Sequence, residues 1–117
     1  MEKQSVDRQA VVAKAFKNAY KTFGLTDAEA ATMLGKTRAT LARNQGFSAT
    51  SKEHEIQVLF IRLYRSLYAI LGGDNAAMKH WFTTSNKHLR GVPKDLVQRI
   101  VGLADINAYL DAMRAKV

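Results

Sequence analysis

Histidine, cysteine and carboxylate side chains are the usual means of catalysis and metal binding, and here they form no recognisable site. The 117 residues include three histidines and no cysteine. His54, His80 and His88 show no i, i+4 pairing with a glutamate base, as a zinc-binding helix requires. The absence of cysteine excludes disulfides, thiol catalysis and thiolate metal ligands. No glycine-rich phosphate loop is present. We therefore expect no catalytic residue, no metal site and no cofactor.

Basic side chains form a more informative pattern. The chain carries 18 Lys and Arg against 10 Asp and Glu, a net charge of +8. The excess is spread evenly, at about +4 in residues 1–50 and about +4 in residues 51–117. This balance is typical of proteins that bind nucleic acid or an acidic partner. A basic surface that serves only solubility is the alternative.

Several basic and hydroxyl side chains fall on two short predicted helices, at about 27–34 and 37–44. Thr26 and Glu29 form a capping box that opens the first helix. Ala31 is small enough for close helix approach, Gly35 suits the turn, and Leu41 is placed to anchor the second helix. This pattern is typical of a helix-turn-helix, although an ordinary helical hairpin would share it. We expect the DNA contacts to come from the second helix and its start: Lys36, Thr37, Arg38, Thr40 and Arg43.

A long helix is predicted over residues 51–71, opened by a second capping box of Thr50 and Glu53. Its apolar residues cover about 200° of the helical wheel, whereas a helix packed on one side needs only about 100°. The helix is therefore either central to the fold or shared with a second subunit. We expect a homodimer or a higher even assembly, built partly on this helix through Leu59, Leu63, Tyr64 and Leu67.

Helical periodicity also organises the rest of the chain. A first helix is predicted at about 6–23, a helix capped by Asp74 at 75–82, and one beginning at Pro93 and running to about 101. Gly102 is expected to separate that segment from a last amphipathic helix. No strand periodicity is present. The predicted fold class is all-α: an N-terminal helix-turn-helix, a long central helix and a C-terminal bundle of short helices.

Residues 86–96 read Asn-x-x-Leu-x-Gly-x-Pro-x-x-Leu, after the pair Trp81-Phe82 and before Gly102. This arrangement resembles the C-terminal domain of the Xre/MbcA/ParS-like antitoxins, over about residues 50–117. A variable helix-turn-helix precedes that domain in the family, so the resemblance accounts for nearly the whole chain. Two positions depart from the family pattern. Arg90 stands where glycine is common, and a single residue separates Gly91 from Pro93.

The resemblance implies an antitoxin that blocks a cognate RES-domain, NAD-consuming toxin and represses its own operon by binding operator DNA. It implies a DNA-binding region at 1–49 and a toxin-binding and dimerisation region at 50–117. The chain's tail would enter or cover the toxin cleft, either through Arg114 and Lys116 or through the Val117 carboxylate. The expected toxin-binding residues are Trp81, Arg90, Arg114, Lys116 and Val117.

Two other functions share these features. One is a stand-alone helix-turn-helix regulator whose C-terminal half only dimerises, and the other is an adaptor that has lost DNA binding. The N-terminus lacks the apolar stretch of a secretion signal. The longest apolar run, 56–71, contains Arg62 and Arg65 and does not suit a membrane span. We therefore expect a cytoplasmic protein without a membrane partner.

Overall fold

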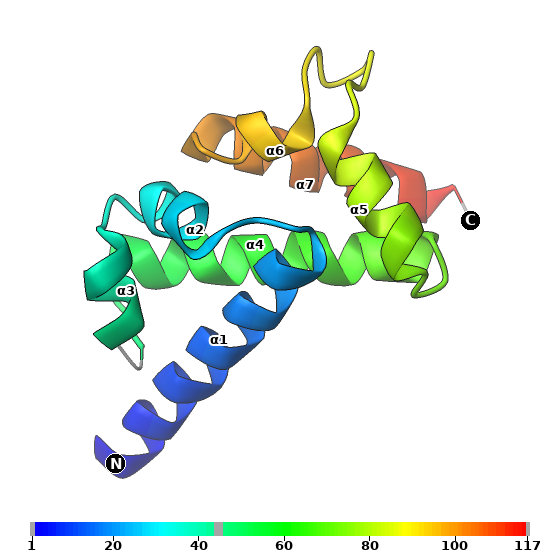
Figure 1. Ribbon diagram of the computed structural model, residues 1–117. Helices are drawn as coiled ribbons and strands as arrows, with labels where there is room; N and C mark the ends of the chain where they lie inside the picture. The colour runs from blue at the N-terminus through cyan, green and yellow to red at the C-terminus, as the bar shows by residue number, and fades with distance from the viewer. Residues whose placement is uncertain (1, 44–45, 117) are drawn as a thin grey trace.

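The computed structural model describes residues 2–43 and 46–116, which form seven helices and no strand (Figure 1). The predicted all-α class is therefore confirmed. The helices are α1 (Glu2–Thr22), α2 (Asp27–Met33), α3 (Arg38–Arg43), α4 (Lys52–Ile70), α5 (Asn75–Thr83), α6 (Pro93–Leu96) and α7 (Ile100–Ala115).

The long helix α4 lies at the centre of the molecule, with α1 and α7 both packed on it (Figure 1). Neighbours on two sides explain why its apolar stripe is wider than one face requires. Of the two interpretations of that stripe, the central position within one chain is the one found. Leu63 and Leu67 are fully buried in this core. They have almost no exposed surface in the single chain, and the dimer contact expected through them stays a prediction.

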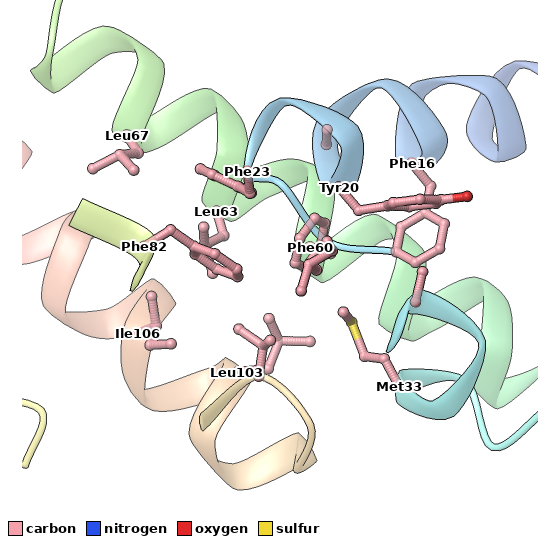
Figure 2. Close-up of a cluster of buried hydrophobic side chains, with 14 of the residues drawn as sticks. Phe16, Tyr20, Phe23, Met33, Phe60, Leu63, Leu67, Phe82, Leu103 and Ile106 are labelled. Atoms are coloured by element: carbon pink, nitrogen blue, oxygen red, sulfur yellow. The ribbon is translucent and has the colours of Figure 1, made fainter. Parts of the chain in front are cut away.

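Aromatic side chains join the N-terminal helices to the C-terminal ones in one core (Figure 2). Phe23, in the turn directly after α1, stacks on Phe82 of α5, with ring centroids 4.3 Å apart. Phe60 of α4 meets the rings of Phe16 and Phe23 edge-on, at 5.5 and 5.7 Å. Such pairs add to the stabilisation that burial alone supplies. Figure 2 also shows Met33 of α2 and Leu103 of α7 in the same cluster. The two predicted regions therefore share one hydrophobic core.

The helix starts mostly follow the predicted caps. Asp74 accepts a hydrogen bond from the Ala77 N–H at 3.1 Å and opens α5. The cap of α4 is Ser51, not Thr50 as the sequence predicted. The Ser51 Oγ accepts from the His54 N–H at 3.1 Å, whereas the Thr50 hydroxyl lies 3.1 Å from the Ser48 Oγ. Because the Thr50 hydroxyl contacts Ser48 in the preceding turn, the N-cap of α4 is the next residue, Ser51.

The prediction for residues 93–102 needs the largest correction. The helix that begins at Pro93 ends at Leu96, and Gly102 lies inside α7 and does not separate two helices. A Cβ at position 102 would stand 2.0 Å from the Leu96 carbonyl oxygen. Glycine is needed there because α7 passes directly against the backbone at the end of α6. Its role is close packing within a helix and not helix termination.

Candidate functional sites

The turn between α2 and α3 has the geometry that the sequence predicted. The Lys36 N–H donates to the Ala31 carbonyl and the Gly35 N–H to the Thr32 carbonyl, both at 2.9 Å, as in a Schellman motif. Gly35 has a φ of 68°, a value that glycine adopts without strain. Ala31 is buried and Leu41 packs against the core. The short helix α3 is therefore held at a fixed angle by a turn and one apolar anchor.

Helix α3 has no buried residue, so it presents most of its surface to solvent. Arg38 and Arg43 are both exposed, and neither forms an ion pair with a side chain of residues 8–43 or 46–116. An exposed guanidinium with free N–H donors is suited to guanine edges and phosphate oxygens. These two side chains are the available cations of the predicted DNA-contacting set.

The other three predicted DNA contacts are engaged within the protein. The Lys36 Nζ lies 3.4 Å from the Glu53 Oε1 and ties the turn to the start of α4. The Thr37 Oγ1 accepts from the Thr40 N–H at 3.1 Å and donates to the Thr40 Oγ1 at 2.9 Å. Thr37 thus acts as the N-cap of α3. These three residues position the helix, and their contact with DNA stays a prediction.

Carboxylates around α2 are held in their charged form. The Tyr20 hydroxyl donates to Asp27 at 2.7 Å, and this bond together with Lys21 lowers the pKa of Asp27. Burial of the Tyr20 ring and, second, the same hydrogen bond raise the pKa of Tyr20. The backbone N–H of Thr26 donates to Glu29 at 2.9 Å, and this bond is the main reason why the pKa of Glu29 is lowered. Partners on the protein itself therefore satisfy these charges.

Glu29 also connects α2 to the C-terminal half. Its Oε2 lies 3.2 Å from the Lys94 Nζ of α6, and its backbone carbonyl accepts from the Gln98 Nε2 at 3.0 Å. One residue of α2 thus combines a helix cap, an ion pair and a hydrogen bond to the segment after α6. A movement of α6 would therefore displace α2, the first helix of the helix-turn-helix.

The loop between α5 and α6 closes on itself through two backbone hydrogen bonds between Asn86 and Gly91, at 2.9 and 3.3 Å. The Asn86 Oδ1 also accepts from the N–H groups of His88 and Leu89, as expected for a turn-capping asparagine. The sharp bend of this loop lies at Arg90, which has a positive φ of 58°, and not at the glycine that follows it. Gly91 instead allows close approach, since a Cβ there would lie 3.2 Å from the Leu96 Cδ2.

The predicted toxin contacts differ in their accessibility. Arg90 and Lys116 are exposed, and Trp81 is half-buried against the core. Arg114 is exposed and makes one long hydrogen bond, 3.4 Å, to the buried Ser66 hydroxyl. Val117 lies outside the described residues. The end of α7 therefore carries two cations with few internal partners.

Figure 1 places α3 and the end of α7 at opposite ends of α4. A helix of this length spans about 28 Å, at 1.5 Å per residue. The two candidate interfaces are therefore separated by most of the molecule, and one partner at each end need not exclude the other.

Among the side chains that the structure describes, no group of three or more His, Cys, Asp or Glu residues is arranged to hold a metal ion. None of the described helices is long and apolar enough to cross a membrane.

One polar core residue was missed by the sequence interpretation. Gln57 of α4 is only 1% exposed, and its Oε1 has no hydrogen-bond partner among the described residues. It lines a pocket between α1, α3 and α4, together with Arg38. The available signal was a polar residue within an otherwise apolar stretch of α4, which was read only for its apolar stripe.

Comparison with known protein families assigns both halves of the chain. Residues 3–62 match the model of the antitoxin Xre-like helix-turn-helix domain. Residues 66–116 match the model of the antitoxin Xre/MbcA/ParS C-terminal toxin-binding domain. The matched ranges meet inside α4, whereas the boundary expected from the sequence, between 49 and 50, stays a prediction. No curated protein matches the chain.

Proposed function

The chain belongs to the Xre/MbcA/ParS-like antitoxin family, and on that premise we propose that it blocks a RES-type, NAD-consuming toxin and represses its own operon. It acts by contact and not by catalysis, in the cytoplasm, where the toxin and the operator DNA are both present. Its DNA contacts come from the α3 end of the molecule, and its toxin contacts come from the end of α7 and the nearby α5–α6 loop.

The observation that supports this proposal best is that exposed cations lie on α3 and at the end of α7. These two elements stand at opposite ends of α4 (Figure 1). Arg38 and Arg43 stand exposed on α3, and Arg114 and Lys116 stand exposed at the end of α7. A protein that must bind DNA and a toxin at once needs this separation. A regulator whose C-terminal half only dimerises has no need of free cations at the end of α7.

Replacement of both Arg38 and Arg43 by alanine tests the DNA contact. One arginine that reads a base contributes about 1–3 kcal/mol, so promoter binding should weaken by at least about 2 kcal/mol per subunit pair. Fluorescence anisotropy with the promoter duplex measures the loss. A variant with Lys79 and Lys87 changed to alanine removes the same charge elsewhere and serves as the matched control. Equal affinity for the Arg38/Arg43 variant and the wild type would refute the assignment.

Removal of residues 114–117 tests the toxin contact. The anchors of α7, Ile106 and Leu110, are fully buried and precede the cut, so the fold and DNA binding should persist. Neutralisation should be lost, because the exposed cations and the chain terminus are removed together. Growth of cells that express the cognate toxin is the readout, at matched antitoxin levels. If the truncated protein still rescues growth, inhibition comes from the surface around Trp81 and Arg90.

We also propose that the protein assembles as an even oligomer. A single helix-turn-helix buries little surface on DNA, and such modules usually bind as pairs. Of the four residues expected at the subunit contact, only Leu59 and Tyr64 retain exposed surface, and Val58 beside Leu59 is exposed as well. Light scattering at tens of micromolar should therefore show at least a dimer, and a monomer would contradict this assembly.

The stand-alone regulator remains the competing function, and a cheap observation separates the two. A RES-type toxin gene directly beside the gene for this chain favours the antitoxin. Co-purification of the neighbouring gene product with the full chain, lost on removal of residues 114–117, would favour it further. DNA binding without any toxin capture would favour the regulator.

A further inference from the structure

Basic side chains of α1 and α3 border one hollow of about 460 Å³. Lys14 and Lys17 line it from α1, and Arg38 lines it from α3. All three side chains are exposed, and none forms an ion pair with a side chain of residues 8–43 or 46–116. The predicted recognition helix α3 therefore has two further cations beside it, supplied by another helix.

The lysines of α1 share one side of that helix. Lys14, Lys17 and Lys21 fall at i, i+3 and i+7, a spacing that stacks side chains on one face over about 10 Å of helix. The chain from residue 8 to residue 26 contains no Asp or Glu. These three lysines, here called the α1 lysine face, thus form a local concentration of positive charge that favours an anionic partner.

Asp27 is the acidic residue that lines the same hollow, and the protein itself compensates its charge. It accepts from the Tyr20 hydroxyl at 2.7 Å and pairs with the Lys21 Nζ at 3.0 Å. These two partners hold the pKa of Asp27 below its usual range, and Lys17 adds the smallest contribution. Lys21 is therefore engaged within the chain, whereas Lys14 and Lys17 are available to a partner.

We propose that Lys14 and Lys17 bind the phosphate backbone of the operator DNA while α3 contacts the adjacent groove. The proposal rests on the proposed DNA contact of Arg38 and Arg43 and extends it to α1. DNA is the anion favoured here because both lysines border the same hollow as Arg38 and because the helix-turn-helix match, residues 3–62, includes α1.

The two kinds of cation divide the work of binding. A lysine ammonium is a point charge that suits a phosphate oxygen, whereas an arginine guanidinium can pair with a guanine edge through two N–H groups. Phosphate contacts fix the position of a protein on the duplex and carry no sequence information. The lysines therefore supply affinity and orientation for any duplex, and the preference for the promoter comes from α3.

Salt dependence distinguishes a phosphate contact from a base contact. Each phosphate that a protein neutralises adds about 0.9 to the slope of log affinity against log salt concentration. Loss of two contacts should therefore lower that slope by about 1.8 and weaken binding at about 0.1 M salt by up to about sixtyfold. Because every duplex carries the same phosphates, promoter and unrelated DNA should lose the same factor.

Fluorescence anisotropy of the full chain with the promoter duplex and with a scrambled duplex, at salt concentrations from about 50 to about 200 mM, tests the proposal. Lys14→Ala with Lys17→Ala should give the smaller slope on both duplexes and an unchanged ratio of the two affinities. Lys14→Arg with Lys17→Arg keeps both charges and should keep the slope. The matched control, Lys79→Ala with Lys87→Ala, removes the same charge from the α5 region and should bind both duplexes as the wild type does.

A wild-type slope for the Lys14/Lys17 alanine variant would overturn the proposal, and the lysines would then be left for another anion, such as an acidic protein. A loss confined to the promoter duplex would also overturn it, because that pattern belongs to a base contact. Arg38→Ala with Arg43→Ala separates these results from a failure of the proposed function. If the arginine variant alone loses promoter binding, α3 contacts DNA and α1 does not. If the arginine variant also binds as the wild type does, or the wild type binds neither duplex, the proposed α3 contact fails and the α1 contact fails with it.

Discussion

Arg90 is the residue whose conformation is least expected from its type. A φ of 58° is left-handed and costs a non-glycine residue about 1–2 kcal/mol. The resemblance to the antitoxin family places glycine at this position, and the backbone explains that preference. A strained residue that persists on an exposed loop is a candidate for contact with a partner.

Arg90→Gly should therefore separate stability from function. The free energy of unfolding should rise by about 1 kcal/mol, because glycine adopts this φ without strain. Affinity for the toxin should fall, because the guanidinium is lost. Urea titration measures the free energy of unfolding, and a toxin-binding assay measures the affinity for the toxin. Arg90→Ala is the matched control, because it removes the same guanidinium but keeps the strained φ. A glycine variant with unchanged toxin affinity would remove Arg90 from the interface.

Acid should loosen the helix-turn-helix through Asp27, Glu29 and Glu53. The pKa of each is lower in the folded chain than in the unfolded one, so the unfolded state binds more protons as the pH falls. Their contribution to stability is complete near neutral pH and is lost below about pH 4. The urea midpoint measured from pH 7 to pH 3 should show this fall. Glu29→Gln should make it shallower, and an unchanged pH profile in that variant would contradict the account.

Residue types and spacing were enough to predict the exposed cations Arg38 and Arg43, but not the buried hydrogen-bond acceptor of Gln57. Arg38 and Arg43 could be placed outward because they follow a capped turn with helical spacing. The partner of Gln57 depends on which helices surround α4, and that is a tertiary property. The same limit applied to Lys36. Its ion pair with Glu53 joins the α2–α3 turn to the start of α4, and the helix-turn-helix pattern does not reveal that contact.

Among the elements, those with strong local signals were predicted best. The capping box of Thr26 and Glu29 and the turn at Gly35 are set by neighbouring residues, and both are present. Gly102 was misread because glycine ends helices more often than it permits a close crossing. The carbonyl that it must clear belongs to Leu96, six residues earlier on another helix. Periodicity along one helix cannot reveal such a neighbour.

The close crossing of α6 and α7 predicts that Gly102→Ala lowers the free energy of unfolding. Helix propensity alone would stabilise the variant by about 1 kcal/mol. The clash with the Leu96 carbonyl should instead destabilise it, by at least about 2 kcal/mol, because backbone has to move. Thermal and urea unfolding both measure this difference. Ala108→Gly at an exposed position of α7 is the control for propensity and should cost about 1 kcal/mol. A stabilised Gly102→Ala variant would show that α6 and α7 do not cross closely.

At the scale of the whole molecule, the two regions predicted from sequence share one core. Phe23 and Phe82 stack across them, and Glu29 joins α2 to Lys94 and Gln98. The chain should therefore unfold in a single transition. Far-ultraviolet circular dichroism reports all helices, and the fluorescence of Trp81 reports α5. Their urea midpoints should coincide. Two separate midpoints would mean that the DNA-binding and toxin-binding regions are stable independently.

We propose that this antitoxin binds DNA at one end of α4 and its toxin at the other. Light scattering on a mixture of the chain, the cognate toxin and the promoter duplex tests it most directly. At saturating toxin, one species whose mass includes all three components is expected. Arg38→Ala with Arg43→Ala should remove only the DNA from that species, and removal of residues 114–117 should remove only the toxin. Release of the DNA from the unaltered chain by saturating toxin would contradict the separation of the two interfaces.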